Sequence, residues 1–134
     1  MRQTLRRRGQ CAKIGNTPTR GYKSVREAER ARVLHLLEKA GKIKDLQEEV
    51  RFELIPAIWQ ATDGTLVEIY NGEESKKKGL RCIQRKCEYF ADFAYIDTET
   101  GKYIVEDAKG WAMEDYKIKK KLMLWVHGIR VKEV

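Results

Sequence analysis

Residues 90–95 read FADFAY and residues 103–110 read YIVEDAKG. Both stretches are rich in aromatic and β-branched residues, so each is predicted to be a strand with an acid embedded among apolar side chains. Side chains two residues apart share a face of a strand, so Asp107 and Lys109 are predicted to point the same way, with Asp92 joining them from the neighbouring strand. Two carboxylates and an ammonium group are costly to bury unless they bind something, and a divalent metal with a phosphate would use all three.

The flanking sequence predicts a mixed α/β (α+β) fold. Helices are expected from Ser24 to about residue 40 and over 114–126, and strands over 48–58, 80–96, 102–109 and 129–134. Residues 59–79, with two Asx-Gly turns and a run of three lysines, are expected to form a hairpin extension with a basic tip. The order helix, three strands, helix, strand predicts a mixed central sheet flanked by helices.

The apolar residues of the two helices predict which faces are buried. The first helix is expected to pack through Val25, Ala28, Leu36, Leu37 and Ala40, and the second through Ile118, Leu122 and Trp125. Gly41 and Gly128 are expected to end the two helices.

The basic residues are concentrated at the N-terminus. Residues 1–23 hold seven of the 28 basic residues and none of the 20 acidic ones, which leaves 21 basic and 20 acidic residues in the rest. We therefore predict a basic, flexible N-terminal arm over residues 1–22, in which Arg6, Arg7 and Arg8 contact nucleic acid, and one folded domain over residues 23–134. The alternative is a solvated tail that binds nothing.

Several protein classes are disfavoured. No apolar run approaches the length of about 18 residues that a membrane span needs, and the basic start is not followed by the apolar stretch of a secretory signal. Three cysteines without a Cys-x-x-Cys pair, together with two distant histidines, argue against a structural zinc site and for reduced thiols. We therefore expect an intracellular, cytoplasmic protein of a bacterium or bacterial host, with no membrane partner.

The acids provide the ligands that Mg²⁺ prefers. Asp92 and Asp107 supply hard oxygen atoms and leave coordination positions for water and phosphate. Such a metal polarises phosphate, while Lys109 steadies the attacking water or the charge that develops on the phosphate. We therefore predict phosphodiester hydrolysis with Mg²⁺ or Mn²⁺ as the cofactor.

Asp92 followed by Asp107-Ala108-Lys109 resembles the signature of the PD-(D/E)XK nuclease superfamily. The segments Ser24-x-x-Glu27-Ala28-Glu29-Arg30, Gly41-Lys42-Ile43, Ala91-Asp92-Phe93 and Val105-Glu106-Asp107-x-Lys109-Gly110 are similar to a phage-encoded, poorly characterised branch of it, related to Holliday-junction resolvases and restriction endonucleases. The resemblance covers about 110 residues and implies a restriction-endonuclease-like αβββαβ core. Two departures are Ala91 in place of the proline that names the motif, and Asp107 in place of glutamate.

The resemblance also implies residue roles. Asp92, Asp107 and the backbone carbonyl of Ala108 would be metal ligands, Lys109 the catalytic lysine, and Glu27 an acid near the metal waters.

Glu27 and Glu106 have other readings. Glu27 also fits a capping box with no chemical role, and a helical wheel places Glu29 nearer the apolar arc. Glu106 is expected to point to the opposite face of the sheet from Asp107 and to be structural or exposed.

The second helix carries a basic face. Lys117, Lys120 and Lys121 recur at helical spacing and are expected to grip the nucleic-acid backbone, with Tyr116 one turn before Lys120. The alternative is an ordinary solvated face. Trp111 could stack on a base or anchor its loop.

These features predict a metal-dependent deoxyribonuclease, specifically a Mg²⁺-dependent endonuclease, in phage DNA recombination or processing, including branched-DNA resolution. Junction resolution would require two active sites and therefore a homodimer, an expectation that follows from the function alone. The alternatives are a non-catalytic DNA-binding protein that retains the nuclease fold, and a protein that acts on RNA.

Overall fold

The computed structural model describes residues 21–108 and 113–134. These residues contain two α-helices, seven β-strands and one 3₁₀ helix. In chain order they are α1 (Val25–Lys39), β1 (Ile43–Ile55), β2 (Ala57–Gln60), β3 (Leu66–Ile69), η1 (Glu74–Lys77), β4 (Arg81–Gln84), β5 (Cys87–Asp97), β6 (Tyr103–Asp107), α2 (Glu114–His127) and β7 (Lys132–Glu133).

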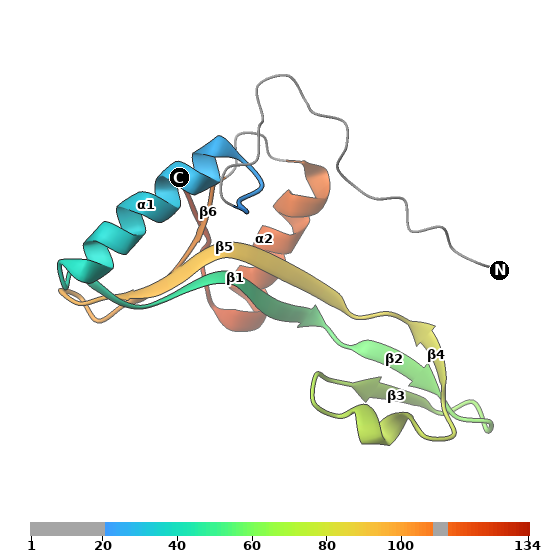
Figure 1. Ribbon diagram of the computed structural model, residues 1–134. Coiled ribbons are helices and arrows are strands. Elements are labelled where there is room, and N and C mark those ends of the chain that lie inside the picture. The colour runs from blue at the N-terminus through green and yellow to red at the C-terminus, as the bar shows by residue number, and fades with distance from the viewer. Residues whose placement is uncertain (1–20, 109–112) are drawn as a thin grey trace.

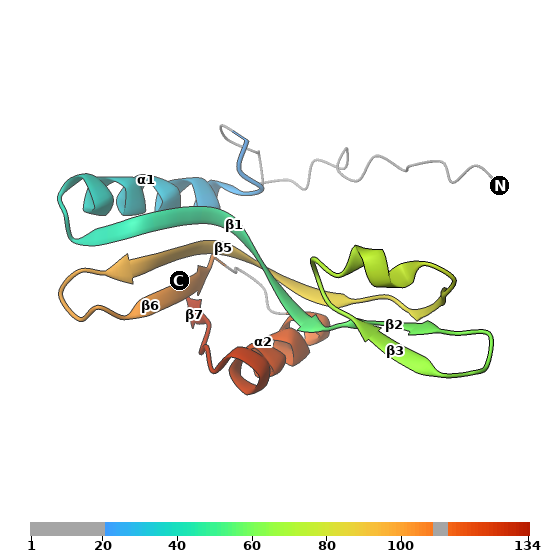
Figure 2. The same cartoon turned by 90° about the horizontal axis from the view of Figure 1, so that it is seen from below.

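The main sheet has the strand order β1-β5-β6-β7. Its first three strands are antiparallel, whereas β7 runs parallel to β6 after the chain has crossed over through α2. The helices α1 and α2 cover opposite faces of this sheet (Figures 1 and 2). The expected mixed α+β fold is confirmed, and the elements of the main body follow the expected order of helix, three strands, helix and strand.

Two apolar clusters lie on the two faces of the main sheet. Ala31 and Leu34 of α1 pack with Phe93 and Tyr95 of β5. Met123 of α2 belongs to the other cluster; its partners include Ala91, Ala94, Val105 and Tyr116. Because both faces are covered, the central strands β5 and β6 are buried on both sides, and their acids lie inside the molecule.

The predicted inner face of α2 is wrong. Ile118 is 57% exposed and Trp125 is 84% exposed, whereas Tyr116 and Met123 are buried against the sheet. Two residues along a helix correspond to a rotation of about 200°, so the predicted stripe lies almost opposite the buried one. Within that stripe, Leu122 alone packs partly against the core.

The prediction for α1 is also partly wrong. Leu36 is 67% exposed and Val25 is 39% exposed, while α1 buries Glu27, Ala28, Ala31 and Leu34. Small alanines let the helix approach the sheet closely around Leu34, which leaves Val25 and Leu36 outside the contact.

The helix ends follow the sequence signals. The Ser24 hydroxyl oxygen accepts a hydrogen bond from the Glu27 amide at 3.1 Å and begins α1. Gly128 ends α2 in the left-handed conformation at φ 68°, which glycine adopts without steric cost. Neither helix has the length and apolar character needed to cross a bilayer.

The extension expected over residues 59–79 is a separate small sheet. Its strand order is β3-β2-β4, and it projects away from the main body at the far ends of β1 and β5 (Figure 1). The expected long strand over 80–96 is divided into β4 and β5, and Pro56 separates β1 from β2. Proline has no amide hydrogen to donate, so the ladder of the main sheet is interrupted there.

Candidate functional site

The two predicted acids lie on adjacent strands. The pairing of β5 with β6 ends at Phe93 and Glu106, the residues that adjoin Asp92 on β5 and Asp107 on β6. The Oδ2 atom of Asp92 accepts a hydrogen bond from the backbone amide of Ala108 at 2.8 Å. The structure therefore places the Asp92 side chain at the end of β6 that carries Asp107 and Ala108.

Both carboxyl groups are removed from solvent. Asp107 is completely buried and Asp92 is 7% exposed. The Tyr89 hydroxyl donates a hydrogen bond to Oδ2 of Asp107. Burial, followed by the charge of Asp107, raises the pKa of Tyr116, so this second tyrosine also lies close to the acid. Burial also raises the pKa of Tyr89, so this phenol keeps its proton and can orient Asp107 by donating to it.

The sequence analysis did not select Tyr89. Strand alternation places Tyr89 and Asp92 on opposite faces, yet the side chain of each reaches the end of β6 that holds Asp107 and Ala108. The two register shifts in the pairing of β1 with β5 lie outside this stretch, between Lys44 and Gln47 and between Glu53 and Ile55, so they do not account for it.

Glu27 of α1 lies near Asp92. It is 4% exposed, and its Oε2 atom accepts a hydrogen bond from the Lys23 amide at 3.1 Å. Burial first, and then the negative charge of Asp92, raise the pKa of Glu27. The helical wheel pointed to the wrong residue, because Glu29 is exposed. Glu27 therefore has both a capping role and a position in the electrostatic field of Asp92.

Glu106 has a structural environment of its own. Its carboxylate receives two hydrogen bonds from the Arg30 guanidinium, at 2.6 and 2.8 Å, and one from the Tyr95 hydroxyl, while Lys132 Nζ lies 3.5 Å away. Burial alone would raise the pKa of Glu106, but the hydrogen bonds from Arg30 and Tyr95 and the nearby cations hold it below the ordinary value. The structural expectation for Glu106 is confirmed, and its side chain is buried rather than exposed.

The predicted lysine lies outside the described residues. The strand β6 ends at Asp107, and the prediction that Asp107 and Lys109 share a face is not tested by the described residues. Trp111 and the arginines of the N-terminal arm, Arg6, Arg7 and Arg8, also lie outside the described residues. Their predicted roles stay predictions.

The three lysines predicted to form a basic face on α2 differ in whether their charge is already paired with an acid. Lys117 forms an ion pair with Glu114 at 3.0 Å, and Lys120 forms one with Glu133. Lys121 is exposed and makes no ion pair with any residue that the structure describes.

Tyr116 is not part of this exposed face, and its predicted surface position is wrong. It is 6% exposed, and its hydroxyl donates to Glu133 at 3.3 Å. The sequence analysis grouped Tyr116 with Lys120 because it lies one helical turn before that lysine. In the structure Tyr116 lies on the side of α2 that packs against the sheet, together with Met123.

The carboxylates fit a divalent cation in some respects. Asp92 and Asp107 offer hard oxygen atoms from adjacent strands, and the mutual repulsion that raises the pKa of Glu27 is what a cation would relieve. Over residues 21–108 and 113–134, no group of three or more His, Cys, Asp or Glu side chains is arranged to hold a metal. Glu27 is therefore a neighbour of the pair rather than a third ligand.

Comparison with known proteins places the chain in a family. The sequence profile of the family described as "Protein of unknown function (DUF1064)" matches residues 10–128, and the chain belongs to this family. Among curated proteins and among solved structures, nothing matches the chain.

Proposed function

We propose that this member of the DUF1064 family is a metal-dependent nuclease that hydrolyses phosphodiester bonds in DNA, in phage recombination or DNA processing. The observation that carries the proposal is the hydrogen bond of 2.8 Å from the Ala108 amide to Asp92 Oδ2, which brings the acid of β5 to the acidic end of β6. The resemblance to the PD-(D/E)XK signature supports the same reaction class.

The electrostatics of the site support a cationic ligand. Asp92 makes no ion pair with any described residue, and neither does Glu27, although both are less than one tenth exposed. Buried carboxylates without a cationic partner are costly, and their proximity adds repulsion. A divalent cation between the aspartates would offset both costs.

The side chains around the pair have separable roles. Asp92 and Asp107 would hold Mg²⁺ or Mn²⁺, which when bound polarises the scissile phosphate. The Ala108 amide orients Asp92, and the Tyr89 hydroxyl orients Asp107 by donating to Oδ2. Glu27, with its raised pKa, can hold or release a proton beside Asp92. Lys109 remains the proposed residue that steadies charge on the phosphate.

The exposed Lys121 supports DNA as the partner, together with the basic N-terminal arm. Contacts of these basic residues with phosphates would carry no base sequence, which favours reading of DNA structure rather than of base sequence. Branched DNA is therefore the substrate we propose to test first, with a homodimer if a junction is resolved.

A cleavage assay tests this function. Purified protein is incubated with supercoiled plasmid and with a synthetic four-way junction, in Mg²⁺, in Mn²⁺ and in EDTA. We expect metal-dependent nicking or resolution that Asp92→Asn, Asp107→Asn and Lys109→Ala each reduce by about 1,000-fold, the scale of losing one preorganised electrostatic group.

Asp97→Asn is the matched control, since Asp97 lies at the other end of β5 and, among the described residues, its side chain accepts a hydrogen bond only from the Glu99 amide of its own turn, at 2.9 Å. It should retain activity. Binding of DNA without cleavage in either metal would refute the nuclease and support the non-catalytic alternative.

A further inference from the structure

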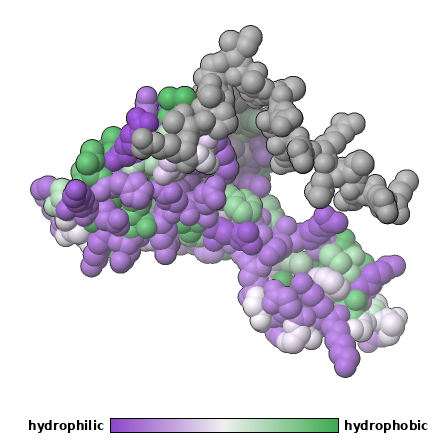
Figure 3. Space-filling view, viewed as in Figure 1, coloured by the Kyte–Doolittle hydropathy of each residue, from purple (hydrophilic) through white to green (hydrophobic). Residues whose placement is uncertain are grey.

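A second candidate site lies away from the acids, in the protruding unit formed by residues 57–86. This unit contains the strands β2, β3 and β4 with η1, and Figure 3 shows hydrophobic residues among its hydrophilic ones. Ile69 is the one large apolar side chain that it buries among the described residues. A unit with so little core contributes few apolar contacts to the stability of the main body.

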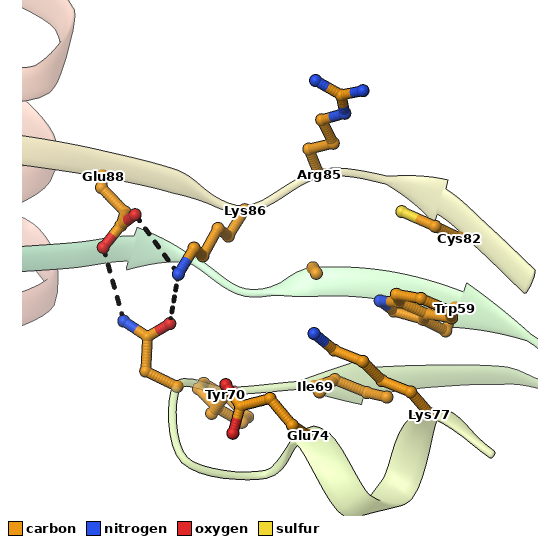
Figure 4. Close-up of a pocket in the computed structure, with 11 residues that line it drawn as sticks. Trp59, Ile69, Tyr70, Glu74, Lys77, Cys82, Arg85, Lys86 and Glu88 are labelled. Carbon is orange, nitrogen blue, oxygen red and sulfur yellow. Dashed lines mark hydrogen bonds and ion pairs between the residues drawn. The ribbon is translucent and has the colours of Figure 1, made fainter. Parts of the chain in front are cut away.

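The protruding unit contains a pocket of about 490 Å³ between η1 and the small sheet. Trp59 of β2 and Ile69 of β3 form its apolar wall, and Tyr70 lies at its edge (Figure 4). The volume falls within the range of about 300–1,000 Å³ that is usual for small-ligand sites.

Trp59 is held in an unusual way. The ammonium nitrogen of Lys77 lies 5.4 Å from the centroid of the Trp59 ring, a cation–π contact. The indole Nε1 atom is buried and has no acceptor among the residues that the structure describes. A buried donor without an acceptor is destabilising, so an acceptor brought by a ligand would be favourable.

The cations around the pocket fall into two kinds. Lys86 is neutralised, because its ammonium group lies 2.7 Å from Asn71 Oδ1 and 3.3 Å from Glu88 Oε1. Lys77 and Arg85 make no ion pair with any described residue, and in Figure 4 the Arg85 guanidinium points outward. Glu74, an exposed acid, also lines the pocket and lies near Lys77 in the view.

We propose that this pocket binds one unpaired nucleotide of a nucleic-acid strand, a proposal that rests on the proposed function. The base stacks on the Trp59 indole, and the adjoining phosphates are neutralised by Lys77 and Arg85. A phosphate competes with the ring for Lys77, so arrival of the strand frees the indole face for the base. The substrate class is therefore DNA with unpaired nucleotides, as at a flap, a gap or a branch point.

The position of the pocket suits this role. The protruding unit continues directly from β1 and into β5, the strand that carries Asp92 (Figure 1). A strand held at the pocket is thereby tethered to β5, one of the two strands that present the acids.

Tryptophan fluorescence tests the proposal without catalysis. The chain has three tryptophans, so the variant Trp111→Phe with Trp125→Phe leaves Trp59 as the single reporter. This protein is titrated in EDTA with an oligothymidylate, with a duplex of equal length, and with polyglutamate. We expect quenching by the oligothymidylate at several-fold lower concentration than by the duplex, and none by polyglutamate. Absence of quenching, or equal quenching by polyglutamate, would overturn the proposal.

Two lysine variants distinguish binding of DNA in the pocket from nonspecific electrostatic attraction to the protein surface. Lys77→Gln and Lys78→Gln carry the same net charge, but Lys78 does not line the pocket and is exposed. We expect Lys77→Gln to weaken oligothymidylate binding by about tenfold and Lys78→Gln by less than about twofold. Equal losses would show binding by charge alone and overturn the proposal.

The two proposals fail separately. Metal-dependent cleavage without Trp59 quenching refutes the pocket alone. Quenching without cleavage refutes the nuclease and leaves the pocket as a site of single-strand binding.

Discussion

Two buried carboxylates on neighbouring strands of this protein, Glu106 on β6 and Asp92 on β5, have opposite surroundings. Glu106 is held by Arg30 and Tyr95, with Lys132 nearby. Asp92 has a backbone amide as its hydrogen-bond donor and lies in the field of another acid, Glu27. The difference teaches that burial alone does not mark a functional acid. An acid paired with a guanidinium supports the fold, whereas acids that repel one another are the ones for which we propose a cation.

The largest expected effect on stability comes from the paired acid. Glu106→Gln should reduce the free energy of unfolding by about 3 kcal/mol, because it leaves the Arg30 guanidinium without its buried counter-charge. Asp92→Asn should leave stability unchanged or raise it, since asparagine still accepts from Ala108 and removes a repulsive charge. Urea denaturation of both variants measures the contrast. Equal destabilisation by the two would erase the distinction between the groups.

The pH dependence of stability sharpens the same contrast. The pKa of Glu106 lies below its ordinary value in the folded protein, so its ionisation stabilises the fold at neutral pH. That contribution is complete above the unfolded-state pKa of about 4.3 and is lost as the pH falls through the lower folded-state pKa. The stability difference between wild type and Glu106→Gln should therefore be full at pH 7 and shrink below about pH 4. A difference that stays constant in an acid titration would contradict the ion pair.

A smaller effect distinguishes two glutamates on one helix. Glu27→Gln should lower cleavage by about tenfold, the scale of losing a group that acts beside the metal ligands. It should also raise the melting temperature, because the pKa of Glu27 is raised by burial and by Asp92. Glu29→Gln, on the exposed side of α1, is the matched control and should change neither quantity. A similar loss of cleavage in Glu29→Gln would remove Glu27 from the site.

The smallest effect is expected on the surface of α2. Lys121→Ala should weaken DNA binding about threefold and reduce the slope of log affinity against log salt by about one. Lys117→Ala should do less, because its ammonium group is already paired with Glu114 at 3.0 Å. Affinities measured by fluorescence anisotropy at several salt concentrations give both numbers. A larger loss for Lys117 would show that the ion pair opens when DNA binds.

The sequence predicted the parts of this molecule that depend on local pattern. Strand propensity placed Asp92 and Asp107 on neighbouring strands, and the capping and glycine signals placed the helix ends. The sequence analysis failed for features that depend on how side chains pack against one another. The buried stripe of α2 is set by how Tyr116 and Met123 meet the sheet, not by which residues are most apolar.

Local sequence patterns also could not predict contacts between residues that are far apart in the chain. Tyr89 reaches Asp107 although strand alternation separates it from Asp92. The partnership of Arg30 with Glu106 joins residues 76 positions apart in the chain and has no local signal.

The most direct test of the central claim is the melting temperature of the protein with and without Mn²⁺ in the absence of DNA. A cation that binds only the folded state stabilises it, and we expect an increase of about 5 °C at saturating Mn²⁺. The increase should disappear in the double variant Asp92→Asn with Asp107→Asn and persist in Asp97→Asn. The same increase in the double variant, or none in the wild type, would contradict a cation held between the two aspartates.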